Sequence, residues 1–390
     1  MTAEPTAPRR PLMLLMLSIA AVGIQALMLS PLLPDIAAGL HAGPREVGFA
    51  AGAYGVGVAA AALLAAPRLG HWPKRAAIRL AFAVQAAALL ICGLAFDWRI
   101  LAAGQLMAGL GSGVIIPATY ALTGDIAAPE QRSQALGRVL FGWSIAMVAG
   151  VPLAAVLSAF VGWRGTFLLV AAVAASMVAG GALLPKTPSH GDGEPVRYLD
   201  VLAIPGALLG YGATFAYMIG FYQTYTFIGD HVRNLHGAGA WLGGAISLSY
   251  GLGFGVGVAF DRWIDAHGPR RVLPLGLFLV GLNYVVLPFA AQSMAAIAVW
   301  PFLWGLANHL CMTALVSYLG SLSAERRGPI MGLFSFVTYV ALGLAGAIYG
   351  SVYAAWGFFA VSFAAAATLW TAALIAGWPR LRRRSSRETP

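Results

Sequence analysis

The segment Gly257–Leu273, with the sequence GVAFDRWIDAHGPRRVL, is the densest group of charged residues between two long apolar runs. The run before it, residues 241–260, and the run after it, residues 272–291, contain no Asp, Glu, Lys or Arg. Each has about the 20 residues that an α-helix needs to cross a bilayer core of about 30 Å. The charged segment is therefore predicted to be a loop at a membrane face.

The same pattern occurs once earlier in the chain. An apolar run at residues 51–66 leads into PRLGHWPKRAAIRL, residues 67–80, and then into another apolar run at residues 81–95. The repetition predicts a duplicated architecture with a charged loop at the same place in each half.

Composition indicates a polytopic membrane protein. Hydrophobic residues make up 59% of the chain and charged residues only 10%, whereas soluble domains have about 25% charged residues. The net charge of +10 is dispersed over short loops and a tail, which is typical of membrane topology and does not indicate nucleic-acid binding. Cys92 and Cys311 lie in apolar runs, so we expect packing roles and neither a disulfide nor a metal site.

Twelve apolar runs predict an all-α integral membrane protein with twelve transmembrane helices. They lie at about 11–33, 46–66, 77–96, 100–122, 136–160, 165–184, 201–224, 240–260, 272–291, 295–319, 329–352 and 355–378. The N-terminal MTAEPTAPRR precedes what we expect to be an uncleaved first helix, because no small-residue cleavage site follows that run.

The distribution of basic residues predicts the orientation. Loops on one side, together with the tail, carry twenty Lys and Arg residues, and those on the other carry four, Arg45, Arg99, Arg164 and Arg233. The positive-inside rule then places both termini in the cytoplasm. The predicted organisation is a cytoplasmic N-terminus (1–10), a six-helix half (11–184), a cytoplasmic linker (185–198) that lets the halves rock, a second six-helix half (199–378) and a basic tail (379–390).

The charged loops resemble a motif of the major facilitator superfamily, G-x-x-x-D-R-x-x-G-R-R, that follows the second helix of each half. The second copy matches it, with WIDAH as an insertion, through Gly257, Asp261, Arg262, Gly268, Arg270 and Arg271. The first copy keeps Arg68, Gly70, Lys74 and Arg75, with Pro67 in place of the Asp. Short cytoplasmic loops also collect Arg and Gly, but two copies at matching places favour the family motif. The resemblance implies two pseudo-symmetric six-helix halves and transport by alternating access.

Further stretches resemble the twelve-helix drug:proton antiporter and sugar-efflux branch of that family. They are SPLLPDIAAGL (30–40), GDIAAPEQRSQALG (124–137), SAERRGPIMG (323–332) and AGVPLAAVLSAFVGWRGTF (149–167), the last containing Gly150 and Pro152 of an antiporter motif. The chain also departs from this branch, because Gln25 stands where an acid is frequent and Gln105 where an arginine is usual. Either an ion pair has been lost as a unit, or the two glutamines hydrogen-bond between helices.

Few titratable residues are available for gating or proton coupling. Asp35 is expected near the outer end of the first helix, as a cap or gating contact more than a proton carrier. Asp125 is expected to pair with Arg132 in an intracellular gate. His309 lies nearest the middle of a predicted span, and because imidazole exchanges protons near neutral pH, we expect it to couple protons or else to pack as a neutral side chain.

By analogy with the family, the first helix of each three-helix unit lines a central cavity. The candidates on these helices are Gln25, Met28, Gln105, Ser112, Tyr217, Phe221, Gln223, Trp304, Asn308, His309 and Met312. Such an apolar and aromatic lining with amides favours a hydrophobic or amphipathic solute, although any single Met, Phe or Trp could simply pack between helices.

The sequence therefore predicts a secondary transporter of the bacterial cytoplasmic (inner) membrane, acting as a monomer. It would export a small organic solute in exchange for protons, without a cofactor. Two alternatives stay open: uptake or uncoupled facilitation of a sugar, organic acid or vitamin, and a membrane sensor that does not transport. An enzyme is not expected, because the sequence contains no nucleotide-binding glycine loop and no metal-ligand cluster.

Overall fold

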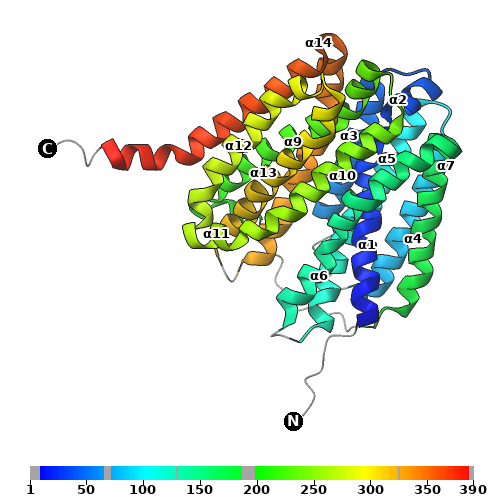
Figure 1. The fold of residues 1–390 in the computed structure, drawn as a ribbon. Helices are drawn as coiled ribbons and strands as arrows, with labels where there is room; N and C mark the ends of the chain where they lie inside the picture. Colours follow the sequence, from blue (N-terminus) through cyan, green and yellow to red (C-terminus); the bar gives the residue numbers. More distant parts are fainter. Residues whose placement is uncertain (1–8, 66–71, 129–130, 187–197, 324–325, 386–390) are drawn as a thin grey trace.

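The structure, a computed structural model, describes residues 9–65, 72–128, 131–186, 198–323 and 326–385, and these residues form only helices, turns and short connections (Figure 1). The N-terminal helices are α1 (Arg9–Leu27), α2 (Leu29–Gly39), α3 (Pro44–Ala65), α4 (Lys74–Gly93), α5 (Trp98–Ile126), α6 (Arg132–Ile145) and α7 (Val151–Gly180). The C-terminal helices are α8 (Tyr198–Leu202), α9 (Ala207–His236), α10 (Ala240–Val256), α11 (Asp261–His267), α12 (Pro269–Ala290), α13 (Met294–Gly320) and α14 (Arg327–Ser385).

The described helices account for twelve membrane crossings. Nine continuous helical segments among the described residues are long and apolar enough to cross a membrane. Two of them, Gln134–Leu183 and Gly328–Gly377, are 50 residues long. Each is interrupted by a glycine with left-handed φ, Gly162 (φ 70°) or Gly357 (φ 73°), and so contains two crossings. The twelfth crossing is the more polar α9, which packs against α2, α13 and α14. The chain is thus an all-helical membrane protein, as predicted.

The bundle has two distinct ends. We call the distal end the one that holds the connection between α2 and α3, and the proximal end the one where α1 begins and α11 lies (Figure 1). The N-terminal helices gather on one side of this view and most of the C-terminal helices on the other, and α3 packs on α14, α2 on α9 and α7 on α10.

Small residues allow the closest of these packings. A Cβ added to Gly52 of α3 would lie 2.7 Å from the carbonyl oxygen of Gly343 in α14, and one added to Gly346 would meet the backbone of Gly48 and Gly52. Real Cβ atoms do not approach backbone atoms so closely, so only glycine permits the two helices to touch there. These glycines lie near the beginning of α3 and in the part of α14 that precedes Gly357. They hold the N-terminal and C-terminal helices together at the distal end.

The charged segment 257–273 is not the loop that its composition predicted. A short 3₁₀ turn, Gly257–Phe260, continues α10 directly into α11, and Ile264 of WIDAH is fully buried at 0% exposure. The chain turns only at Gly268, whose φ of 79° ends α11 before Pro269 begins α12. The prediction was wrong because charge marks the membrane face, but charge alone does not break a helix.

The seventh predicted span was displaced. We predicted residues 201–224, whereas α9 is Ala207–His236. The predicted run ended at residue 224, ahead of the polar sequence that follows Phe227, but Asp230 in that sequence is buried at 4% exposure. Polar groups that face the interior of the bundle lower the hydropathy of a helix without ending it. The predicted linker lies almost wholly at residues 187–197, outside the described residues.

Candidate functional site

A small cavity lies between the N-terminal and C-terminal helices. The cavity has a volume of about 20 Å³, which is room for about one water molecule. None of its lining side chains is a titratable acid or base of the Asp, Glu, His, Lys or Arg type. The lining consists of Gln25, Ala26, Leu27, Leu29, Ser30, Ala51, Tyr54, Gln105, Tyr222, Tyr225, Thr226 and Leu342.

Two amides provide much of the polarity of this cavity. Gln25 Nε2 donates a hydrogen bond to Gln105 Oε1 at 2.9 Å, which joins α1 to α5. Gln25 is 1% exposed and Gln105 is 2% exposed. The remaining atoms, Gln25 Oε1 and Gln105 Nε2, have no hydrogen-bond partner among the described residues. The expected bond between helices is therefore present, and it leaves one acceptor and one donor unused.

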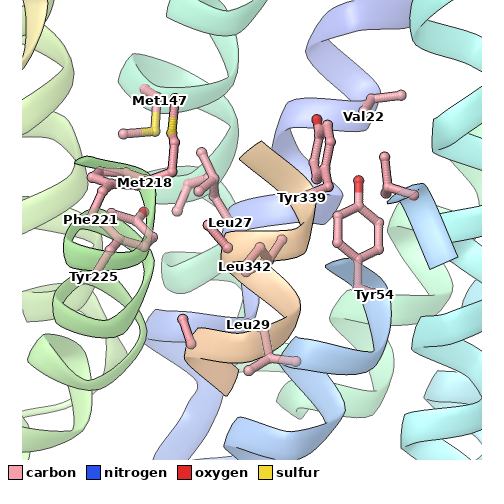
Figure 2. Close-up of a cluster of buried hydrophobic side chains, with 14 of the residues drawn as sticks. Val22, Leu27, Leu29, Tyr54, Met147, Met218, Phe221, Tyr225, Tyr339 and Leu342 are labelled. Carbon is pink, nitrogen blue, oxygen red and sulfur yellow. The ribbon is translucent and has the colours of Figure 1, made fainter. Parts of the chain in front are cut away.

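Apolar and aromatic side chains surround the amides. In the view of Figure 2, Leu27, Leu29 and Leu342 lie between Phe221 and Tyr225 on one side and Tyr54 and Tyr339 on the other. Phe221 and Tyr225 stack with ring centroids 5.4 Å apart. The cavity therefore combines two amides and several hydroxyl groups with apolar and aromatic surface.

Of the eleven side chains predicted to line the cavity, the structure places Gln25 and Gln105 there. The others lie in helix contacts. Met28 is fully buried at the break between α1 and α2, Ser112 accepts from Gln85, and Tyr217 donates to the Asn308 carbonyl. Gln223 donates to Val361 O and Asn308 to Trp304 O. Phe221 and Trp304 belong to an aromatic cluster, and Met312 packs against the core.

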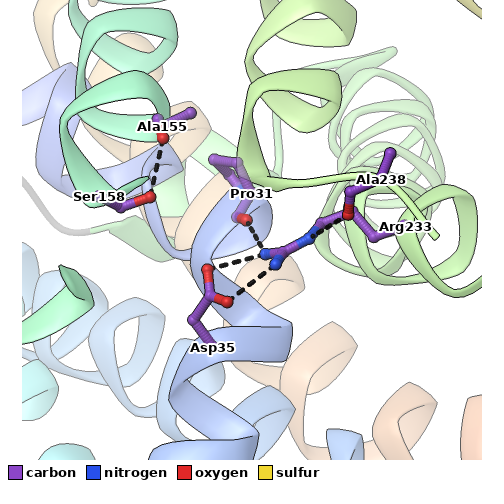
Figure 3. A network of polar contacts seen from close by, with 6 residues as sticks. All are labelled: Pro31, Asp35, Ala155, Ser158, Arg233 and Ala238. Atoms are coloured by element: carbon purple, nitrogen blue, oxygen red, sulfur yellow. Dashed lines mark hydrogen bonds and ion pairs between the residues drawn. The ribbon is translucent and has the colours of Figure 1, made fainter. Parts of the chain in front are cut away.

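Above the cavity, an ion pair joins the two sets of helices at the distal end. Arg233 of α9 makes two hydrogen bonds to Asp35 of α2, each 2.8 Å long (Figure 3). The same guanidinium donates to the carbonyl oxygens of Pro31 and Ala238 at 3.2 Å and 3.3 Å. The Ser30 hydroxyl also donates to Tyr225 O across the same interface. Such fork-shaped pairing fixes geometry more strongly than a lysine could, and here it links α2 to α9 at the distal end.

At the proximal end the acidic residue of the predicted intracellular gate has a different partner. Asp125 Oδ2 lies 2.7 Å from Lys74 Nζ, while Arg132, its expected partner, begins α6 with an exposed side chain. The pair joins α4 to α5 and stays within the N-terminal helices. Lys74 is buried at 8% exposure, so Asp125 compensates a cation that is largely removed from water.

His309 does not face the cavity as predicted. Its Nε2 lies 2.8 Å from Asp261 Oδ1 and 3.3 Å from the hydroxyl of Thr313. Its ring packs edge-on against Phe254 at 5.0 Å. Gly257 allows this position, because a Cβ there would collide with the imidazole. The side chain thus points toward α10 and α11 and away from the N-terminal helices.

The remaining motif residues are mostly exposed or structural. Arg262, Arg270 and Arg271 have exposed side chains, and Arg75 donates to the Leu184 carbonyl at 3.1 Å. Gly150 ends a π-helical turn, Ala146–Gly150, before α7, and Pro152 packs against Gly244 of α10. Arg68 and Gly70 lie outside the described residues.

A buried carboxyl on α9 was missed from the sequence. Asp230, 4% exposed, accepts hydrogen bonds from the Tyr353 hydroxyl at 2.6 Å and from Asn234 Nδ2 at 3.1 Å. The adjacent His231 stacks on Phe358 with centroids 4.8 Å apart. The sequence signal was available, since GDHVR has three titratable residues directly after an apolar run, but we read it as a loop.

Comparison with known proteins gives a consistent assignment. The family model described as the Major Facilitator Superfamily matches residues 15–260. The chain is also similar to an uncharacterized MFS-type transporter, YwfA, of Bacillus subtilis (strain 168), with 29% identity over 361 residues. That alignment covers 90% of this chain and 88% of the relative.

Proposed function

Because this chain belongs to the major facilitator superfamily and is a secondary transporter of that family, we propose that it exports a small hydrophobic or amphipathic organic solute by alternating access. One observation carries the proposal. A cavity without charged side chains is lined by both the N-terminal and the C-terminal helices, and an ion pair between the same two sets closes the distal end. A solute that binds at this interface between the two sets can leave toward the distal end only when the ion pair opens.

We propose an inner-membrane orientation with both termini in the cytoplasm. The excess of Lys and Arg at the proximal end supports it, and so does the similarity to a bacterial transporter. The distal end then faces outward. Tags at the N-terminus, at His190 and at the C-terminus should report cytoplasm, and a tag beside Arg233 should report the outside.

Proton exchange is the proposed driving force, with His309 as the group that binds the proton. Its contact with Asp261 at 2.8 Å supports this role, because it ties the imidazole of α13 to a carboxylate on α11. Protons drive transport only if the two conformations bind them differently. We propose that rearrangement of α11 against α13 changes the contact between Asp261 and His309 during each cycle, while Asp35 acts in gating.

Flux measured with purified protein in proteoliposomes tests the function. A metabolite library is first screened by thermal shift, and a stabilising compound is then used as the radiolabelled solute with and without a pH gradient. Proton-driven accumulation is the expected result. Equilibration without accumulation would indicate an uncoupled facilitator, and binding without flux would indicate a sensor.

A further inference from the structure

A second and larger cavity lies at the proximal end of the C-terminal helices. Its volume is about 740 Å³, which is within the range of roughly 300–1,000 Å³ that is typical of small-molecule sites. Its walls are the connection before α9, the end of α11, the first turn of α12 and the end of α13. We call it the proximal cavity. It shares no lining residue with the small cavity at Gln25 and Gln105, so it is a separate site.

Two adjacent arginines give the proximal cavity its charge. Arg270 and Arg271 occupy the first turn of α12, and both line the cavity. Neither guanidinium makes an ion pair or a hydrogen bond with any other described residue. Asp265 is the one acid among the described lining residues, so two positive charges face one negative charge. The lining therefore has an excess of positive charge and unused N–H donors.

Two further features favour an anion in the proximal cavity. The cavity also includes His267, whose Nδ1 donates to the Trp263 carbonyl oxygen at 2.9 Å and whose ring packs on the Trp263 ring at 4.6 Å. These contacts hold the imidazole in place and leave Nε2 without a hydrogen bond to another described residue. In addition, α12 has 22 residues, and the beginning of a helix carries a partial positive charge.

The wall opposite the arginines is held by its own hydrogen bonds. The Tyr318 hydroxyl donates to the Gly206 carbonyl oxygen at 3.1 Å, and the Ser321 hydroxyl donates to the Tyr318 carbonyl oxygen at 2.7 Å. Gly206 has a φ of 92°, and a Cβ there would lie 2.5 Å from the Tyr318 hydroxyl oxygen. The cavity is thus shaped by contacts between α9 and α13 that do not involve the arginines, and substitution of the arginines should leave its shape intact.

We propose that the proximal cavity binds a phosphate group, with Arg270 and Arg271 as its main ligands. A guanidinium matches phosphate oxygens with two parallel hydrogen bonds, and a phosphate has enough oxygens to accept from both arginines at once. The phosphate would belong to a phospholipid headgroup or to a soluble phosphorylated molecule. Trp263 on α11, 39% exposed, favours the lipid, because exposed tryptophans are typical of the headgroup region. The competing explanation is that the two arginines only set the topology of the membrane protein.

Probes that differ only in the phosphate or in net charge provide the test. The full chain in nanodiscs of phosphatidylcholine is titrated with glycerol 3-phosphate and with glycerol, and microscale thermophoresis gives both dissociation constants. In a second arm, the detergent-solubilised chain is incubated with equal amounts of phosphatidylglycerol and phosphatidylcholine that have the same acyl chains, and native mass spectrometry measures which lipid stays bound. We expect a preference of about tenfold for the anionic probe in at least one arm, since charge-assisted hydrogen bonds are strong.

Variants assign that preference to the cavity. Arg270→Gln combined with Arg271→Gln should reduce the tenfold preference to less than about twofold. Arg262→Gln combined with Arg138→Gln is the matched control, because it removes the same charge from two exposed arginines that do not line the cavity, and it should keep the preference. If the first double variant does not fold, Arg271→Gln alone replaces it, with Arg262→Gln as its control and a roughly threefold loss expected.

The two arms identify the source of the phosphate. A preference for phosphatidylglycerol without binding of glycerol 3-phosphate assigns the cavity to a lipid headgroup, and the reverse assigns it to a soluble phosphorylated molecule. The proposal is wrong if neither anionic probe is preferred by the wild type, if the preference survives loss of both cavity arginines, or if the control variant loses it equally. All of these measurements concern binding alone, so they do not depend on the direction or the driving force of transport.

Discussion

The ion pairs at the two ends of the bundle connect different parts of the molecule. At the distal end, Asp35 and Arg233 join α2 to α9 and thus link the N-terminal to the C-terminal helices. At the proximal end, Lys74–Asp125 and Asp261–His309 each join helices of one set. Among the described residues, ion pairs therefore link the two sets of helices at the distal end and reinforce each set separately at the proximal end.

This difference indicates which contacts must break during a transport cycle. Opening the distal end requires separation of Asp35 from Arg233 and of α3 from α14, whereas the proximal pairs can persist while the two sets rock. Distal substitutions should therefore change conformational equilibrium, and proximal substitutions should change coupling or stability.

The largest effect is expected from the glycine contact at the distal end. Gly346→Val should prevent distal closure, because its side chain would meet the backbone of Gly48 and Gly52. Overpacking of about 1–3 kcal/mol corresponds to a roughly five- to hundredfold loss of the distal-closed state, and solute flux in proteoliposomes should fall accordingly. Gly332→Val on the same helix has nothing within 4 Å of its Cβ position and should retain flux. Equal loss in both variants would mean that the helix tolerates no β-branched residue.

Removal of the distal ion pair should have the next largest effect. Asp35→Asn leaves Arg233, whose side chain is 12% exposed, without its carboxylate. Because Asp35 itself is 37% exposed, we expect less than the roughly 3–5 kcal/mol lost when a fully buried pair is broken, about 1.4 kcal/mol or tenfold in flux, in both exchange and gradient-driven modes. Arg233→Lys keeps the positive charge but cannot make the two parallel hydrogen bonds of the guanidinium. Its flux should lie between that of the wild type and that of Asp35→Asn.

Accessibility provides an independent check on the same substitution. A cysteine at Thr226, which lines the cavity, should react faster with a membrane-impermeant maleimide added from the distal side when Asp35→Asn is present. The native Cys92 and Cys311 are buried and should contribute little background. Unchanged labelling would show that the ion pair does not hold the distal end closed.

The sequence predicted the fold well, because transmembrane runs depend on composition over about 20 residues. It also identified Gln25 and Gln105, since a polar pair within apolar helices departs from a family pattern. It failed where function depends on which face of a helix meets the cavity. Tyr222 has aromatic neighbours in the sequence and Leu342 lies in an apolar stretch of α14, so no periodicity separates their cavity face from their packing faces.

Contacts between residues far apart in the chain could not be predicted from the sequence either. Asp261 and His309 are 48 residues apart in the chain, and their contact depends on α11 continuing α10 as a helix. The sequence assigned this segment to a loop, so it could not place the carboxylate beside the imidazole. Asp230 was lost for a related reason, because we predicted that the helix ended before it.

Substitution of His309 tests whether the proton-binding group lies at the proximal end of the molecule. His309→Gln should abolish accumulation driven by a pH gradient while leaving solute exchange within about twofold, because glutamine can hydrogen-bond but does not titrate near neutral pH. The measurement is the accumulation ratio and the exchange rate in the same proteoliposomes.

Asp230→Asn is the matched distal variant, since it removes another buried titratable group and keeps a hydrogen-bond acceptor for Tyr353. It should accumulate solute like the wild type. If it loses accumulation and His309→Gln keeps it, the proton carrier lies near the distal ion pair, and the assignment to the proximal end is wrong.

The smallest effect is expected at the proximal pair that lies within the N-terminal helices. Lys74→Met removes a cation whose side chain is 10% exposed and leaves Asp125, 26% exposed, able to be hydrated. A partly solvated carboxylate tolerates this loss better than a fully buried one, so we expect about 1–2 kcal/mol of destabilisation and a melting temperature lower by a few degrees. Arg99→Met is the control, because the Arg99–Asp97 pair is exposed at 74% and 37% with a separation of 3.6 Å, and its melting temperature should not change.

Distal labelling should be the same in both variants and the wild type, since neither pair connects the two sets of helices. Faster distal labelling in Lys74→Met would instead mean that the two ends are coupled through α4 and α5, and that the proximal pair contributes to closure of the distal end.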